Sequence, residues 1–82
     1  MIDQLHIIDG YQDGERFHVR GIAGHAVDEW YRADGLRSMA RIIAGEAFTM
    51  TIDGGYKEIH FTAEEAAQIT KEMFMIADHL EG

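Results

Sequence analysis

Cysteine and proline are absent from this chain of 82 residues, and serine occurs only once. Without cysteine the protein has no disulfide, no thiolate nucleophile and no cysteine-bound zinc. Without proline its edge strands lack one of the usual guards against pairing with a further strand. The chain also lacks any apolar run near the roughly 18 residues that a membrane span needs, and its start shows no signal-peptide pattern. We therefore expect a cytoplasmic protein that does not insert into membranes.

The motifs of common catalytic sites are missing as well. Ser38, the one serine, lies in a predicted helix without an adjacent base, and no G-x-S-x-G, P-loop or G-x-G-x-x-G sequence is present. The sequence DGG at residues 53–55 predicts a turn, because no basic residue or helix start follows the glycines directly. A chain this short seldom encloses a pocket of about 300 Å³. An acid–base pair such as His18 with Asp9 stays open as an alternative, but we expect a protein that is not an enzyme and binds no cofactor.

The length predicts one small domain, residues 1–82, close to the lower limit for a self-sufficient core. A core of this size leaves only about 3–5 kcal/mol of stability unless something else contributes, such as oligomerisation. Because the edge strands also lack proline, the sequence favours a homodimer joined through strand edges or helix faces.

Basic residues are scarce, above all in the second half of the chain. The formal net charge is −8, from fifteen acidic and seven basic side chains, and residues 42–82 hold only two of the basic ones. Such a surface repels phosphate backbones, so we expect no direct binding to DNA or RNA. It attracts a basic surface on a protein partner, although excess acid also serves solubility alone.

The clearest element that the chain does contain is an amphipathic helix at residues 63–80, AEEAAQITKEMFMIADHL. One stripe at helical spacing holds its apolar residues Ala66, Ile69, Met73, Ile76, Ala77 and Leu80. The preceding sequence predicts a capping box, in which Thr62 and Glu65 bond each other's backbone amides. Carboxylates in a first turn, here Glu64 and Glu65, also complement the helix dipole. The two glutamates are therefore explained without a ligand.

Residues 48–61 predict a β-hairpin around the DGG turn. A two-residue turn at the two glycines pairs Met50 with Ile59 and Phe48 with Phe61. A turn one residue earlier pairs Phe48 with Ile59 instead. Both registers place the large apolar side chains on one face, whereas a three-residue loop would mix the faces and is rejected.

The first half of the chain predicts a looser version of the same unit. Residues 5–8, LHII, and residues 15–19, ERFHV, are typical of strands. The six residues between them, 9–14, predict a connection because they hold two Asp-Gly pairs. Residues 21–24, GIAG, predict a flexible joint after the second strand.

A second helix is predicted at residues 35–44, GLRSMARIIA, with Asp34 as N-cap and Gly45 as the stop. Residues 26–33, AVDEWYRA, are ambiguous: the apolar residues suit a helix, while alternate residues also suit a strand, and we favour the helix. The element order is then ββαββα. It predicts an α+β fold of two layers, in which an antiparallel sheet of about four short strands is covered on one face by two helices.

Five histidines invite a metal site, but none forms a pair at metal-ligand spacing. His79, in the last turn of the final helix, suits the negative end of its dipole. His18 is expected across from Asp9. His25 is expected one helical turn from Asp28, as a local ion pair. We expect no metal, and a histidine-built metal or small-ligand site is the third alternative.

Two kinds of side chain are candidates for partner binding. Trp30 and Tyr31 are adjacent, so they cannot both point inward. Phe74 and Met75 widen the apolar stripe of the final helix. Aromatic residues and methionine flanked by charge are typical of binding hot spots, although these four suit a core equally well. The carboxylates predicted to contact a basic partner are Glu58, Glu64, Glu65, Glu72 and Asp78.

The leading hypothesis is a small acidic protein, not an enzyme, that binds and blocks a basic macromolecular partner. In size and charge it resembles phage-borne inhibitors of bacterial defence complexes, including anti-CRISPR proteins that mimic nucleic acid. The alternative is a homo-oligomeric structural or adaptor subunit, in which the charge serves solubility only.

Overall fold

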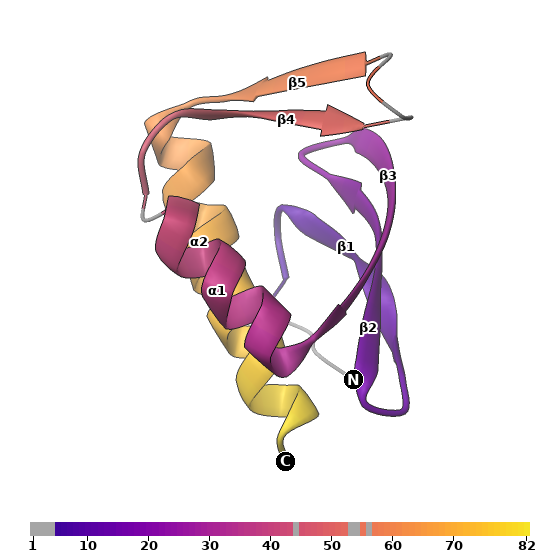
Figure 1. Ribbon diagram of the computed structural model, residues 1–82. Helices are drawn as coiled ribbons and strands as arrows, with labels where there is room; N and C mark the ends of the chain where they lie inside the picture. The colour runs from indigo at the N-terminus through magenta and orange to yellow at the C-terminus, as the bar shows by residue number, and fades with distance from the viewer. Residues whose placement is uncertain (1–4, 44, 53–54, 56) are drawn as a thin grey trace.

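The computed structural model describes residues 5–43, 45–52, 55 and 57–82. In chain order the elements are β1 (Ile8–Asp13), β2 (Arg16–Ile22), β3 (His25–Arg32), α1 (Ala33–Ile43), β4 (Phe48–Ile52), β5 (Lys57–Phe61) and α2 (Ala63–Leu80). The protein is α+β, as predicted, but its strands form two sheets, β1-β2-β3 and β4-β5, where one sheet of about four strands was expected. Figure 1 shows the helices side by side, with the three-stranded sheet beside them and the β4–β5 hairpin across one end.

The helix favoured for residues 26–33 is wrong, because most of this segment forms β3. This strand pairs antiparallel with β2, so that Trp30 lies opposite His18 and Tyr31 opposite Phe17. The alternation of side chains in this segment correctly indicated a strand. The local preferences for helix and strand were nearly balanced, and pairing with β2 selected the strand. Three strands rather than two therefore precede α1.

The predicted flexible joint at residues 21–24 is a tight hairpin turn. Ile22 pairs with His25, which leaves only Ala23 and Gly24 between the strands. Their φ angles are 52° and 81°, and positive values at both central positions are what a type I′ turn requires. This turn matches the twist of the flanking strands, so it orients β3 closely against β2.

The first hairpin is displaced from its predicted position. Residues 9–14 were expected to connect two strands, but most of them lie in β1. Asp13 pairs with Arg16, so the turn is confined to Gly14 and Glu15. Backbone pairing with β2 outweighs the low strand propensity of the two Asp-Gly pairs.

The first helix begins earlier than predicted. Asp34 was expected as the N-cap, but α1 starts at Ala33. Asp34 lies in the first turn, where its carboxylate accepts a hydrogen bond from the Gly35 amide at 2.9 Å. The helix ends at Ile43, close to Gly45, the predicted stop.

The β4–β5 hairpin has the first of the two predicted registers. Phe48 pairs with Phe61 and Met50 with Ile59. The predicted turn lies partly outside the described residues. Ile59 and Phe61 are buried, whereas Phe48 and Met50 are only half-buried. The side chains of β5 therefore contribute more to the core than those of β4.

The last helix, α2, spans Ala63–Leu80, the range that the sequence predicts. Its capping box is confirmed: the Thr62 hydroxyl accepts the Glu65 amide at 3.1 Å, and the Glu65 carboxylate accepts the Thr62 amide at 2.9 Å. In the described part of the chain, no helix is both long enough and apolar enough to span a membrane.

The core lies between the helix pair and the inward faces of both sheets. Its buried residues include Phe17, Val19 and Ile22 from β2, Leu36 and Ala40 from α1, Ile59 and Phe61 from β5, and Ile69, Met73 and Ile76 from α2. Among the described elements, no helix covers the opposite face of the three-stranded sheet (Figure 1). That face is called the open face below.

Candidate functional site

The open face carries an aromatic cluster made of Tyr11, His18 and Trp30. The strand register produces it, because Tyr11 lies opposite His18 and His18 lies opposite Trp30. Phe17 and Val19, the neighbours of His18, point to the other side and are buried, as the two-residue period of a strand requires. One residue from each of the three strands thus forms a continuous row.

The rings of the aromatic cluster pack in well-defined orientations. His18 and Trp30 stack with their centroids 4.3 Å apart and 3° between their planes. Tyr11 meets both rings edge-on, at 5.2 Å from His18 and 6.1 Å from Trp30. The guanidinium carbon of Arg16 lies 4.5 Å from the centre of the Trp30 ring, which is a cation–π distance. Ring pairs of these geometries contribute about 0.5–1.5 kcal/mol beyond the area that they bury.

A chain of hydrogen bonds runs through the same cluster. His18 Nε2 lies 2.5 Å from Asp28 Oδ1, and His18 Nδ1 lies 3.2 Å from the Tyr11 hydroxyl. When the neutral ring carries its proton on Nε2, His18 donates to Asp28 and accepts from Tyr11, so both bonds are satisfied. The Asp28 side chain is 84% exposed, against 16% for His18. The imidazole is therefore mostly covered and links Tyr11 to Asp28, whereas the Asp28 carboxylate faces solvent.

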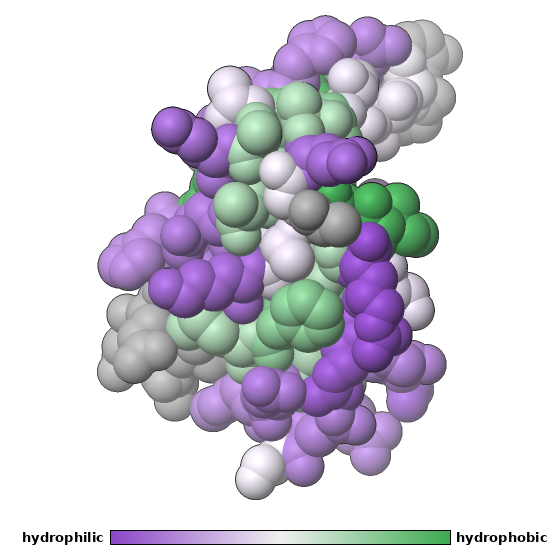
Figure 2. Space-filling view, turned by 90° about the vertical axis from the view of Figure 1, so that its left-hand side faces the viewer, coloured by the Kyte–Doolittle hydropathy of each residue, from purple (hydrophilic) through white to green (hydrophobic). Residues whose placement is uncertain are grey.

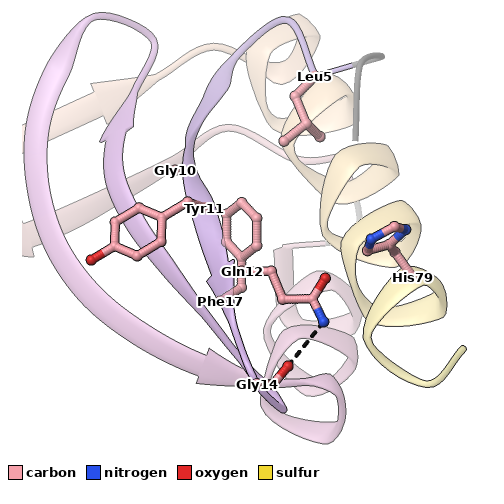
Figure 3. A pocket seen from close by; sticks show the side chains of 7 residues that line it. All are labelled: Leu5, Gly10, Tyr11, Gln12, Gly14, Phe17 and His79. Carbon is pink, nitrogen blue, oxygen red and sulfur yellow. Dashed lines mark hydrogen bonds between the residues drawn. The ribbon is translucent and has the colours of Figure 1, made fainter. Parts of the chain in front are cut away.

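A groove of about 420 Å³ lies on the other side of β1, between this strand and the end of α2. Figure 3 shows His79 on the helix side and Gln12 on the strand side, whereas the Tyr11 ring points away toward the open face. Gln12 donates a hydrogen bond to the Gly14 carbonyl at 2.9 Å. The hydrogen-bonded network of Tyr11, His18 and Asp28 lies on the open face instead.

Glu72 was predicted to contact a partner, and this prediction is wrong because its side chain is fully buried. Its carboxylate accepts hydrogen bonds from the Ile7 amide at 3.0 Å and the Ile8 amide at 2.9 Å. Gln68, one helical turn away, donates to the same group at 2.5 Å. A buried carboxylate is tolerated only when its oxygens are bonded in this way. Glu72 therefore attaches the start of β1 to α2 and has a structural role.

The other predicted acidic contacts fall into two groups. Glu65 is held in the capping box, and Asp78 lies 2.7 Å from the guanidinium of Arg37. Glu58 and Glu64 are exposed, and Glu58 lies 3.9 Å from His60. Because three of the five predicted carboxylates are hydrogen-bonded within the molecule, the acidic surface near them is smaller than the sequence indicates.

The four apolar candidates also differ in their positions. Trp30 points outward in the aromatic cluster, whereas Tyr31 is half-buried against the core. Burial, and to a smaller degree the Glu29 carboxylate, raises the pKa of the Tyr31 hydroxyl above its ordinary value of 10.0. Phe74 and Met75 are half-buried on α2. Figure 2 shows apolar surface between the two helices, flanked by strongly hydrophilic side chains.

Tyr11 and the true partner of His18 were not predicted from the sequence. Asp9 was expected across from His18, but the hydrogen-bonded carboxylate is that of Asp28. The signal was present, since strand alternation places Asp28 and Trp30 on the same face. The helix expected for residues 26–33 does not have this alternation, so the pairing of Asp28 with His18 was not predicted.

The histidines do not converge. Among the described residues, no three His, Asp or Glu side chains gather as metal ligands. The His25 ring meets Phe61 edge-on at 6.3 Å, and the ring of His60 shares a hydrogen bond of 2.9 Å with the Thr49 hydroxyl. His79 lines the groove beside β1.

Fold and surface together define a small α+β protein with two antiparallel sheets, a pair of helices and an exposed, ordered aromatic cluster. Comparisons with protein-family models, with curated proteins and with solved structures find no match for the chain. Its function is therefore inferred from the surface itself.

Proposed function

We propose that this protein is a binding protein without catalytic activity, and that it contacts a protein partner through the open face of the three-stranded sheet. The aromatic cluster carries the proposal. Tyr11 and Trp30 are exposed by 45% and 39%, and the Arg16 guanidinium lies over the Trp30 ring. Tryptophan, tyrosine and arginine are the residues most enriched at binding hot spots. Because stacking and hydrogen bonds already order these side chains, association costs little further side-chain entropy.

The geometry favours a protein partner over a nucleic acid. Bases bind to sheet surfaces by stacking on open aromatic faces. Here the Trp30 ring is already stacked on His18 and approached by the Arg16 guanidinium, which leaves less of its face for a base. The net charge of −8 adds repulsion from phosphates.

Charge indicates that the partner surface is basic. Asp28 is exposed at the border of the aromatic cluster, and Asp9 and Asp13 are exposed on β1. A basic surface opposite them gains favourable long-range attraction from the whole molecule. A small acidic protein that covers a basic surface also blocks the access of nucleic acid to it. This is the inhibitor role that its size and charge suggest by resemblance to phage-borne inhibitors of bacterial defence complexes.

Capture from a native host lysate, quantified by mass spectrometry, tests the surface. Four baits are compared: the wild type, W30A, Y11A and I42A. The matched control is I42A, because Ile42 is an apolar residue of α1 that is 78% exposed and lies outside the cluster. We expect one partner to be retained by wild type and I42A but reduced at least about tenfold by W30A, the effect of truncating a hot spot. A partner retained equally by all four baits would contradict the proposal.

The electrostatic part of the proposal has a separate test. Once the partner is purified, its affinity is measured from low to high salt. We expect binding to weaken steadily with ionic strength, because screening reduces attraction between exposed charges. An affinity that stays flat would show that the partner is not recognised through basic charge.

A further inference from the structure

Among the described residues, none pairs with β4 on the side away from β5. In the described part of the chain it pairs with β5 alone, and its sheet has only two strands. A two-stranded sheet is marginal by itself, and an unpaired edge presents N–H and C=O groups to any further strand. The sequence of this strand, FTMTI at residues 48–52, contains neither charge nor proline, which are two of the usual guards against further pairing.

An apolar groove of about 290 Å³ lies between β4 and the end of α1. Its apolar lining is formed by Met39, Ile42, Ile43, Ala47, Phe48 and Met50. Ile42 is 78% exposed, and Phe48 and Met50 are only half-buried. Exposed apolar side chains that gather beside a free strand edge mark an interaction site rather than scattered surface residues.

The residue pattern of β4 allows two copies of this strand to pair with each other in antiparallel orientation. A two-fold axis at Met50 places this residue opposite Met50 of a second copy. It also places Thr49 opposite Thr51, and residue 48 opposite residue 52. Phe48 and Met50 then share one face of the joined sheet and the threonines share the other, which is the alternation that fixes strand register.

Charge favours a second copy as the occupant of this edge. Two molecules of net charge −8 repel each other, so they associate best through surface that carries no charge. The five residues of β4 meet this condition, and Glu46 is the charged residue that lines the groove beside them. The strand β1, which is also at a sheet edge, does not, because Asp9 and Asp13 would bring like charges together. A basic peptide, by contrast, would gain no attraction from the neutral residues of β4.

We propose that two copies of the chain associate by antiparallel pairing of their β4 strands. The product is a continuous sheet in the order β5-β4-β4-β5, with the apolar grooves of both copies beside it. This interface leaves the aromatic cluster of each copy free, so it is independent of the partner-binding function proposed above.

Sedimentation velocity over a range of concentrations up to about 1 mM tests the pairing. The test variant is T49K/T51K, which places lysines opposite lysines across the two-fold axis. Both threonines are exposed, so the fold should persist, and circular dichroism verifies this. The control Q12K/A26K adds the same charge at exposed positions of β1 and β3. We expect at least about tenfold weaker self-association for T49K/T51K than for the control, since like charges directly opposite destabilise paired strands.

A charge-reversed variant makes the result specific to this register. T49E/T51E should also be monomeric alone, but an equimolar mixture with T49K/T51K should form a heterodimer, because each carboxylate then faces an ammonium group. Heterodimer formation also requires that both variants are folded. The proposal is overturned if the wild type stays monomeric up to about 1 mM. It is equally overturned if T49K/T51K associates as well as the control, or if the mixture contains no heterodimer.

Discussion

The two sheets of this protein expose opposite kinds of surface. The three-stranded sheet presents side chains: an aromatic cluster whose rings are stacked and whose polar atoms are bonded through His18 to Tyr11 and Asp28. The two-stranded sheet presents main chain: an edge of β4 without charge, next to the exposed Ile42. Both surfaces contain apolar groups and have carboxylates nearby, but only the side chains of the first are already ordered by stacking and hydrogen bonds.

This difference shows how one small acidic protein can use different surfaces for a partner protein and for a second copy of itself. An ordered cluster beside carboxylates suits a different protein of opposite charge. A neutral edge with unpaired main-chain groups suits a second copy, because it lets two equally charged molecules approach. Hydrophobicity alone would not distinguish the two surfaces. Charge and the state of the backbone hydrogen bonds do.

The largest expected effect comes from removing the contact that holds the three-stranded sheet on α2. We expect E72A to lower the free energy of unfolding by about 2–4 kcal/mol, because the Ile7 and Ile8 amides lose their buried acceptor. E72Q should cost less, since one amide oxygen still accepts. Urea denaturation measures both, with E64A, an exposed glutamate of the same helix, as the control. Equal midpoints for E72A and E64A would refute the structural role of Glu72.

A smaller effect is expected at the bulge that aligns the aromatic cluster. The register of β1 shifts between Asp9 and Gly10, and a Cβ at Gly10 would lie 2.1 Å from the His18 carbonyl oxygen. Because backbone must move to make room, we expect G10A to cost about 1–3 kcal/mol. The helical control G35A has space and should be neutral or stabilising. Thermal unfolding compares the two variants, and an unchanged Tm for G10A would show that β1 does not need the bulge.

The smallest effect compares a tyrosine on each face of the sheet. Since burial raises the pKa of Tyr31, its contribution to stability is complete below pH 10.0 and is lost as pH rises through the folded-state value. We therefore expect Y31F to lose less stability than the wild type above pH 10.0. The control is Y11F, because Tyr11 is exposed. Denaturant midpoints measured across this pH range provide the test, and parallel curves for wild type and Y31F would contradict it.

The parts of the fold that were predictable are those specified by nearby residues. The capping box and apolar stripe of α2 lie within one segment, and so do the alternation and turn of the β4–β5 hairpin; both were placed correctly. The candidate site was less predictable. Trp30 was identified as a surface aromatic, but Tyr11 and His18 were not joined to it. Their proximity depends on the pairing of β2 with two different strands.

Contacts between segments that are distant in the sequence determine the remaining features. Residues 26–33 suit a helix or a strand, and only the presence of β2 selects the strand. Glu72 has the helical position of a surface glutamate, and only the main chain of residues 7 and 8, more than sixty residues away, makes its burial favourable. Composition and charge follow directly from the amino-acid sequence, and α2 and one hairpin follow from local periodicity and capping. Which side chains form the surface was decided by long-range packing.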